Sequence, residues 1–335
     1  PDDGYIGHDF AENGYDGQGP FIYKHYPPGP EMILGVLTII LGPDQIDLYR
    51  LFPISIAAVA MLAFAYQLWL RLAFARALLL LVVCASFPMF TNMMHGLHYQ
   101  SYSFSLVLIE IALLIRMMFR MEEGRRVGIW DYAPFIPIGF VQGYLSFDHV
   151  FLVPLIPFAV LATARRIARP VIVCAVVSMV LLGGSFAAAH AVHFGQVVLF
   201  DHSVSAAIQD FLASARYNAY QRFAIHNPIE AALLYAFAYS SEPHGFNISL
   251  VMFDLILLLL AALAGSRPGG GVTVGRMVAV ELVAALAGLS WMLAMPAHAG
   301  AHVHFIVRDM FIAYFAPALY LVRNLPLAWP RHAVA

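Results

Sequence analysis

Apolar runs separated by short polar connections account for most of the chain. Several runs approach the roughly 20 residues that a helix needs to cross a bilayer, so the pattern predicts an all-α polytopic bundle of about nine membrane-spanning helices. The runs occupy positions 51–70, 77–93, 100–119, 133–148, 150–163, 170–190, 248–264, 277–296 and 304–322. Prolines interrupt the fourth and fifth runs, which predicts two short helices whose backbone groups are satisfied by protein or water.

Composition narrows the class of protein. Hydrophobic residues make up 61% of the chain and charged residues 11%, far from the composition of soluble domains. The net charge of -2 excludes a nucleic-acid partner, because no basic field is large enough to collect a phosphate backbone. Cys84 and Cys174 both lie within apolar runs, which excludes a disulfide framework. Because the sequence starts at Pro1, we expect a signal anchor or a first span to precede it.

Arginines fall in alternate connections between the apolar runs. By the positive-inside rule those connections are cytoplasmic, and the remaining connections lie on the opposite, extracytoplasmic face. The arginines concerned are Arg71, Arg76, those between Arg116 and Arg126, Arg165, Arg166, Arg169, Arg267, Arg276, Arg323 and Arg331. Every histidine except His332 maps to the opposite face or to a span end beside it, which predicts a polar cleft there.

This orientation divides the chain into four parts. They are a first extracytoplasmic loop (1–50), the first part of the bundle (51–190), a long extracytoplasmic loop (191–247) and the last three spans with the C-terminal tail (248–335). The short apolar run 31–41 ends at Gly42-Pro43, which favours a helix lying in the membrane interface. An amphipathic run at 203–224 predicts a surface helix in the long loop.

The only lysine of the chain, Lys24, lies in a proline-rich segment that ends at Pro30. Pro27 and Pro28 fix their own φ angles and hold the residues before them extended, so the segment is stiff. An ammonium here is a compact charge suited to a phosphate. A lysine at the lipid headgroups, just before a helix, is the alternative.

A series of motifs runs through the first 55 residues. In order they are Asp2-Asp3, Tyr5, Phe10-Ala11-Glu12-Asn13-Gly14, Asp16-Gly17-Gln18, Tyr23-Lys24-His25-Tyr26-Pro27-Pro28, Leu41-Gly42-Pro43 and Tyr49-Arg50-Leu51. This order resembles the first outer loop of polyprenyl-phosphate-dependent glycosyltransferases of the GT-C fold, the superfamily of dolichyl-phosphate-mannose protein mannosyltransferases and aminoarabinose transferases. That family has an Asp-Glu pair and a Lys- or His-Pro-Pro element, whereas this chain has Asp-Asp and two residues between Lys24 and Pro27.

The resemblance implies inverting transfer of a sugar from a lipid phosphate to an acceptor. Such a transfer needs one base at the acceptor and fixed cations at the departing phosphate. The resemblance assigns Asp2 as the base, Asp3 to the acceptor or a metal, and Asp9 as a substitute. Candidates for the donor phosphate are Lys24, His25, Arg216, Arg222 and Arg308, and candidates for the substrate cleft are Tyr5, Tyr23, Tyr26, His95, His98, Asp148 and His149.

Ionisable residues also occur within or between the apolar runs. Asp148 and His149 lie in a short turn between the two proline-broken runs, where they form a candidate site or mark the water boundary. Glu110, Asp254 and Glu281 lie inside runs, where they pair with Arg116 or other polar side chains, or line a path. Their spacing leaves these alternatives open.

The histidines suggest a metal site. Pairs three residues apart can share a ligand from one helix face, although interfacial or hydrogen-bonded histidines are commoner. The pairs and clusters are His95 with His98, His190 with His193, and His298 with His302 and His304. If a divalent cation is the cofactor, His302 and His304 with Asp2 or Asp3 are its candidate ligands. Carboxylate ligands alone would suit Mg²⁺ or Mn²⁺ and would leave the histidines to bind the acceptor or the phosphate.

The expected protein is therefore an integral membrane glycosyltransferase of a bacterial inner membrane, with its active site on the periplasmic face. Its expected partners are a polyprenyl-phosphate-sugar donor, a lipid, glycan or protein acceptor, and membrane lipid. One alternative is a transporter or flippase of a lipid-linked or small anionic substrate, although the sequence has no internal repeat. Another is a non-catalytic membrane subunit of a larger complex.

Overall fold

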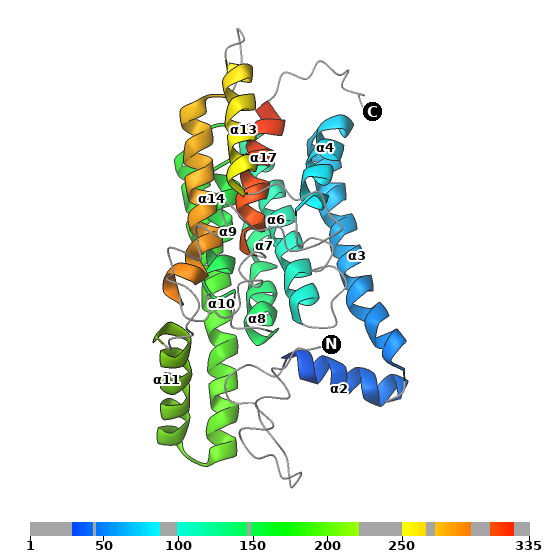
Figure 1. Ribbon diagram of the computed structural model, residues 1–335, viewed down its shortest axis with the longest axis vertical. Coiled ribbons are helices and arrows are strands. Elements are labelled where there is room, and N and C mark those ends of the chain that lie inside the picture. Colours follow the sequence, from blue (N-terminus) through cyan, green and yellow to red (C-terminus); the bar gives the residue numbers. More distant parts are fainter. Residues whose placement is uncertain are drawn as a thin grey trace.

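The computed structural model describes residues 29–42, 45–87, 99–145, 149–220, 250–265, 272–295 and 309–324. Across these residues the chain forms helices and no strands, which confirms the all-helical class. The helices are α2 (Gly29–Leu41), α3 (Ile46–Arg71), α4 (Phe74–Ala85), α6 (Tyr99–Glu122), α7 (Ile129–Tyr132), α8 (Phe135–Leu145), α9 (Leu152–Leu161), α10 (Arg169–Asp201), α11 (Val204–Tyr220), α13 (Leu250–Gly265), α14 (Val274–Ala294) and α17 (Phe311–Asn324). In Figure 1 the long helices follow the long axis of the molecule, whereas α2 lies across it.

Three helices in the described part are long and apolar enough to cross a membrane. They cover Asp47–Arg71, Ser101–Glu122 and Arg169–Asp201. Shorter apolar helices of 10–17 residues cover Met32–Leu41, Phe74–Ala85, Leu152–Leu161 and Met252–Leu263. The membrane character is thus supported by three helices, and the count of about nine spans stays a prediction.

Helix α10 is longer than a bilayer requires. Its 33 residues rise about 50 Å, against about 30 Å of hydrocarbon. It continues past the expected end at 190 as far as Asp201, where His202 adopts a left-handed conformation with φ 53°. The Ala206 N–H then donates to the Ser203 hydroxyl at 3.2 Å, and α11 begins. The chain therefore forms a helix within the predicted run 203–224, beside the far end of α10 (Figure 1).

Two glycines bring α8 against α10. A Cβ on Gly139 would lie 2.5 Å from the Leu182 carbonyl oxygen, and one on Gly143 would lie 2.7 Å from that of Phe186. This Gly-x-x-x-Gly spacing lets two helix backbones approach closely, as it does between helices in membranes. The earlier glycine of α8 contacts the earlier residue of α10 and the later glycine contacts the later one, so α8 and α10 run in the same direction.

Helix α17 is the centre of the bundle. Every residue from Phe311 to Arg323 is buried, so the helix is covered on all sides. Its first turns hold an aromatic cluster: the Phe311 ring lies edge-on to the rings of Phe87 at 5.4 Å and Phe104 at 5.1 Å. Tyr314 stacks on Phe253 at 4.5 Å between ring centroids. The start of α17 is therefore held by α6 and α13 together with the segment that follows α4.

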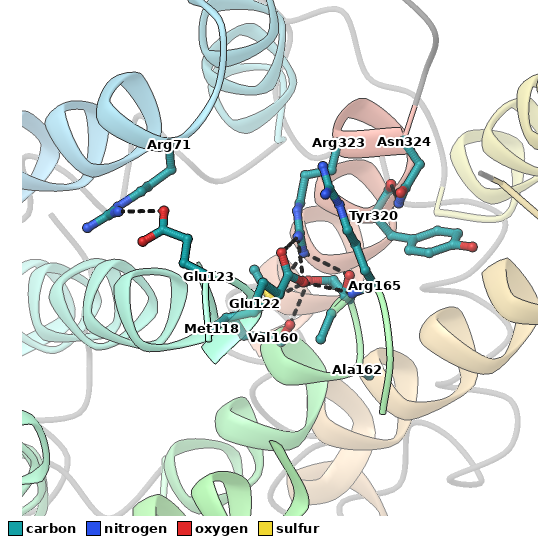
Figure 2. A network of polar contacts seen from close by, with 12 residues as sticks. Arg71, Met118, Glu122, Glu123, Val160, Ala162, Arg165, Tyr320, Arg323 and Asn324 are labelled. Atoms are coloured by element: carbon teal, nitrogen blue, oxygen red, sulfur yellow. Dashed lines mark hydrogen bonds and ion pairs between the residues drawn. The ribbon is translucent and has the colours of Figure 1, made fainter. Parts of the chain in front are cut away.

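The ends of several helices meet in a polar network, which Figure 2 shows and which we name the arginine end. Arg323 of α17 donates to both carboxylate oxygens of Glu122 on α6, at 2.8 and 2.6 Å, and to the Thr163 carbonyl at 2.8 Å. Arg276 of α14 donates to the carbonyls that follow α9, at 2.8 and 3.0 Å. Arg71 at the end of α3 pairs with Glu123 at 3.4 Å. Arginine-rich connections far apart in sequence thus share one end, as predicted.

Helix α2 lies at the opposite boundary. From Arg169 to Phe186, α10 rises about 26 Å away from the arginine end. Gly143 abuts Phe186, and Gly29 at the start of α2 packs against the backbone of Tyr144. Since this distance is close to the roughly 30 Å thickness of bilayer hydrocarbon, it supports the expected interfacial position of α2.

Candidate functional site

Most of the residues predicted for the site lie outside the described residues. These are Asp2, Asp3, Tyr5, Asp9, Tyr23, Lys24, His25, Tyr26, His95, His98, Asp148, Arg222, His302, His304 and Arg308. Arg216 lies in α11, in a part of the helix where the structure describes the backbone alone. His149 is the one predicted site residue whose side chain is described.

His149 forms a buried pair with Asp309. Its Nδ1 lies 3.0 Å from Asp309 Oδ1, and the two residues are 4% and 2% exposed. The residues lie 160 positions apart, His149 just before α9 and Asp309 just before α17. An ionisable pair withdrawn from water is held by its mutual hydrogen bond, because an isolated charge there would be strongly unfavourable.

The pair is recessed within the bundle. Both α9 and α17 run from it toward the arginine end, over 10 and 14 residues, or about 15 and 21 Å. The pair therefore lies about 15–20 Å from the arginine end, inside the roughly 30 Å that hydrocarbon occupies. Of the two interpretations of the turn at His149, a candidate site and a water boundary, this burial favours the first.

Helix α14 packs against the backbone of Asp309. A Cβ on Gly288 would lie 3.0 Å from both the Asp309 carbonyl oxygen and the Met310 sulfur. A larger residue here would require the neighbouring atoms to shift by a few tenths of an ångström, so glycine favours this close approach of α14. Together with the aromatic cluster one turn further along α17, this contact gives the Asp309 backbone a defined position.

Asp309 was not among the predicted site residues. It follows Arg308 directly and lies inside the apolar run 304–322. A carboxylate within an apolar run is itself a signal, because such residues are rarely placed in a membrane without a function. That signal identifies the residue but not its partner.

The other acidic residues of the apolar runs differ in their surroundings. Glu110 on α6 is fully buried, and neither carboxylate oxygen has a hydrogen-bond partner among the described residues. It does not pair with Arg116, whose ion pair is with Asp131 at 3.8 Å. Asp254 on α13 and Glu281 on α14 are partly buried and close enough to interact electrostatically. Burial of a carboxyl group in an apolar bundle without a hydrogen-bond partner costs free energy.

Within the described ranges, no group of three or more His, Cys, Asp or Glu side chains is placed so that it could hold a metal ion. His190 and His193 lie on the part of α10 beyond Phe186, and the His190 ring lies 4.9 Å from that of Phe186. The candidate ligands His302 and His304 lie outside the described ranges, so a divalent cation stays a prediction.

Comparisons with protein families, with curated proteins and with solved structures found no match for this chain.

Proposed function

We propose that this chain is a membrane glycosyltransferase of the GT-C type, which moves a sugar from a polyprenyl-phosphate donor to an acceptor on the extracytoplasmic face. The observation that carries the proposal is the His149–Asp309 pair, 3.0 Å apart and buried. It joins two segments that the sequence separately predicts to belong to the site, because Asp148 precedes His149 and Arg308 precedes Asp309.

The proposed chemistry divides between two kinds of residue. Asp2 acts as the base that takes the proton of the acceptor, with Asp3 beside it and Asp9 as its substitute. Lys24, with Arg308 and the other candidate cations, stabilises the charge that the phosphate gains as the sugar leaves. Inversion follows because one displacement occurs and no second carboxylate forms a covalent intermediate.

His149 and Asp309 act in this proposal as positioning residues. Their side chains face each other and not a solvent cleft, and they are too buried to meet a charged donor directly. The pair holds the starts of α9 and α17 together, and so fixes the chain next to Arg308. Small displacements of a group that stabilises a transition state have large effects on rate.

The arrangement of the bundle supports the proposed sidedness. The arginine end would face the cytoplasm by the positive-inside rule, and α2, α11 and the far end of α10 lie toward the other side. The polyprenyl donor would reach the site from the bilayer, and α11 would lie over its outer side as a surface helix.

The direct test measures sugar transfer by protein reconstituted in liposomes with a polyprenyl-phosphate-linked sugar. Asp2→Asn combined with Asp3→Asn should abolish transfer, and Lys24→Ala should raise the KM for the donor more than that for the acceptor. Glu123→Gln, an exposed change at the arginine end, is the matched control and should leave transfer unchanged. Full transfer by the Asp double variant would refute the assignment of the base.

The positioning role has its own test. Asp309→Asn keeps the size of the side chain but removes its charge, so it should lower kcat while leaving the acceptor KM within about two-fold. An unchanged kcat would contradict a role in placing Arg308.

Glu110 favours a second candidate function. A fully buried carboxyl group without a hydrogen-bond partner among the described residues is expected along a proton or substrate path in a transporter. Under this alternative, liposomes would move a lipid-linked or anionic substrate across the bilayer without cleaving it, and Glu110→Gln would stop that movement. Transfer of the sugar by the same liposomes, unaffected by Glu110→Gln, would exclude this alternative.

A further inference from the structure

A basic surface of five exposed arginines lies outside the network at the arginine end. We name it the arginine patch; it consists of Arg125, Arg126, Arg165, Arg166 and Arg169. Two connections carry it, the one between α6 and α7 and the one between α9 and α10. The Glu122 carboxylate at the end of α6 accepts a hydrogen bond from the Arg165 backbone N–H at 2.8 Å, so the two connections adjoin.

The patch is not neutralised by the protein. Arg125 pairs with Glu123 at 3.3 Å, whereas the other four have no carboxylate partner among the described residues. Glu122 is already engaged by the buried Arg323, and Asp131 by Arg120 and Arg116. Glu122 and Asp131 are therefore paired with arginines outside the patch, and Glu123 is shared by Arg71 and Arg125. The other four arginines of the patch are exposed to solvent with their charge unpaired by any described carboxylate.

Apolar side chains stand exposed beside these charges. Ile129 and Trp130 of α7 are 78% and 85% exposed, and Ile167, between Arg166 and Arg169, is 49% exposed. Helix α7 packs on the first turns of α10, because the Tyr132 hydroxyl is hydrogen-bonded to the Cys174 thiol group. Asp131 fixes its start by accepting a hydrogen bond from the Gly128 N–H at 2.9 Å. The exposed Trp130 is thus presented next to the patch, not on a free loop.

We propose that the arginine patch, with Trp130 beside it, binds the headgroup of an anionic phospholipid. Guanidinium groups match phosphate oxygens in pairs, and exposed tryptophan with an aliphatic neighbour is typical of the membrane–water interface. The patch lies at the start of the longest membrane-crossing helix, where headgroups would lie. A zwitterionic lipid supplies the same acyl chains but no net negative charge, so it fits the apolar side chains and not the arginines.

The test titrates purified protein in neutral detergent with phosphatidylglycerol and follows bound lipid by native mass spectrometry. Each unpaired arginine near an anionic surface contributes about a five-fold gain in affinity, so Arg126→Gln, Arg166→Gln and Arg169→Gln together should weaken binding roughly 100-fold. The matched control, which combines Arg126→Lys, Arg166→Lys and Arg169→Lys, keeps the charge and should retain affinity within about ten-fold.

Three comparisons keep the outcome decisive. Phosphatidylcholine should bind the natural protein at least ten-fold more weakly than phosphatidylglycerol, and glycerol phosphate should not displace the lipid at equal concentration. Because the three arginines are exposed, the glutamine variant should have the same unfolding temperature as the natural protein when both are measured without lipid. The proposal is overturned if that variant binds phosphatidylglycerol normally, if both lipids bind equally, or if glycerol phosphate displaces the lipid.

Discussion

The ion pair between Arg323 and Glu122 provides the sharpest test of how the helices are held together. Arg323 is buried, with its side chain 3% exposed, and its guanidinium lies 4.5 Å from the centre of the Phe119 ring. Glu122→Gln removes the negative charge while keeping the shape of the side chain. The next residue offers a control, because Glu123 also pairs with an arginine, Arg71, but its side chain is 40% exposed.

The two substitutions should differ several-fold in effect. Removing one partner of a buried pair leaves an uncompensated charge and costs about 3–5 kcal/mol in the free energy of unfolding. Breaking an exposed pair costs about 0–1 kcal/mol, because water and salt already screen it. At about 2 °C for each kcal/mol in a chain of this size, Glu122→Gln should lower the unfolding temperature by about 6–10 °C and Glu123→Gln by about 2 °C or less.

The protein carries its own reporter for this measurement. Cys84 and Cys174 are free and buried, so a dye that becomes fluorescent on reacting with thiols reports unfolding in detergent. Glu122→Leu combined with Arg323→Met replaces both charges with apolar groups, so it should be more stable than Glu122→Leu alone. Equal unfolding temperatures for Glu122→Gln and Glu123→Gln would refute the reasoning, since burial would then make no difference to the pair.

Two further predictions concern the bundle. Gly143→Ala should destabilise the protein by about 1–3 kcal/mol, because its Cβ would meet the backbone of α10. The control Gly184→Ala, with open space around it, should be neutral or stabilising. Equal unfolding temperatures for the two variants would contradict close packing of α8 against α10. The variants Arg126→Cys and His202→Cys should react with a membrane-impermeant thiol reagent from opposite sides of sealed vesicles. Labelling of both from one side would show that α10 does not cross the membrane.

Hydrophobic pattern predicted much of the fold. The run 51–70 lies within α3 and the run 100–119 within α6, because a helix must be apolar over its whole lipid-facing length. The proline-broken runs became the short helices α8 and α9, and Pro157 lies inside α9. The arginine connections share one end, as the positive-inside rule requires.

Other features depended on contacts that sequence spacing does not encode. The pairing of His149 with Asp309 requires the starts of α9 and α17 to meet, which is decided by packing across the bundle. The length of α10 was underestimated because His190 and His193 resemble the beginning of a polar loop, although a helix can continue past a membrane surface. The sequence assigns Arg323 only to the cytoplasmic side. Its burial against Glu122 depends on the packing of α17 against the end of α6, which lies far away in the sequence.

The length of α10 has a mechanical consequence. It exceeds the thickness of bilayer hydrocarbon by about 20 Å, which forms a stiff rod, and α11 folds back from the tip of this rod. Tilting that rod by about 10° would carry the tip sideways by about 3–4 Å without breaking one of its backbone hydrogen bonds. Because α11 is joined to that tip, a small tilt of α10 among the buried helices would be amplified into a larger displacement of α11.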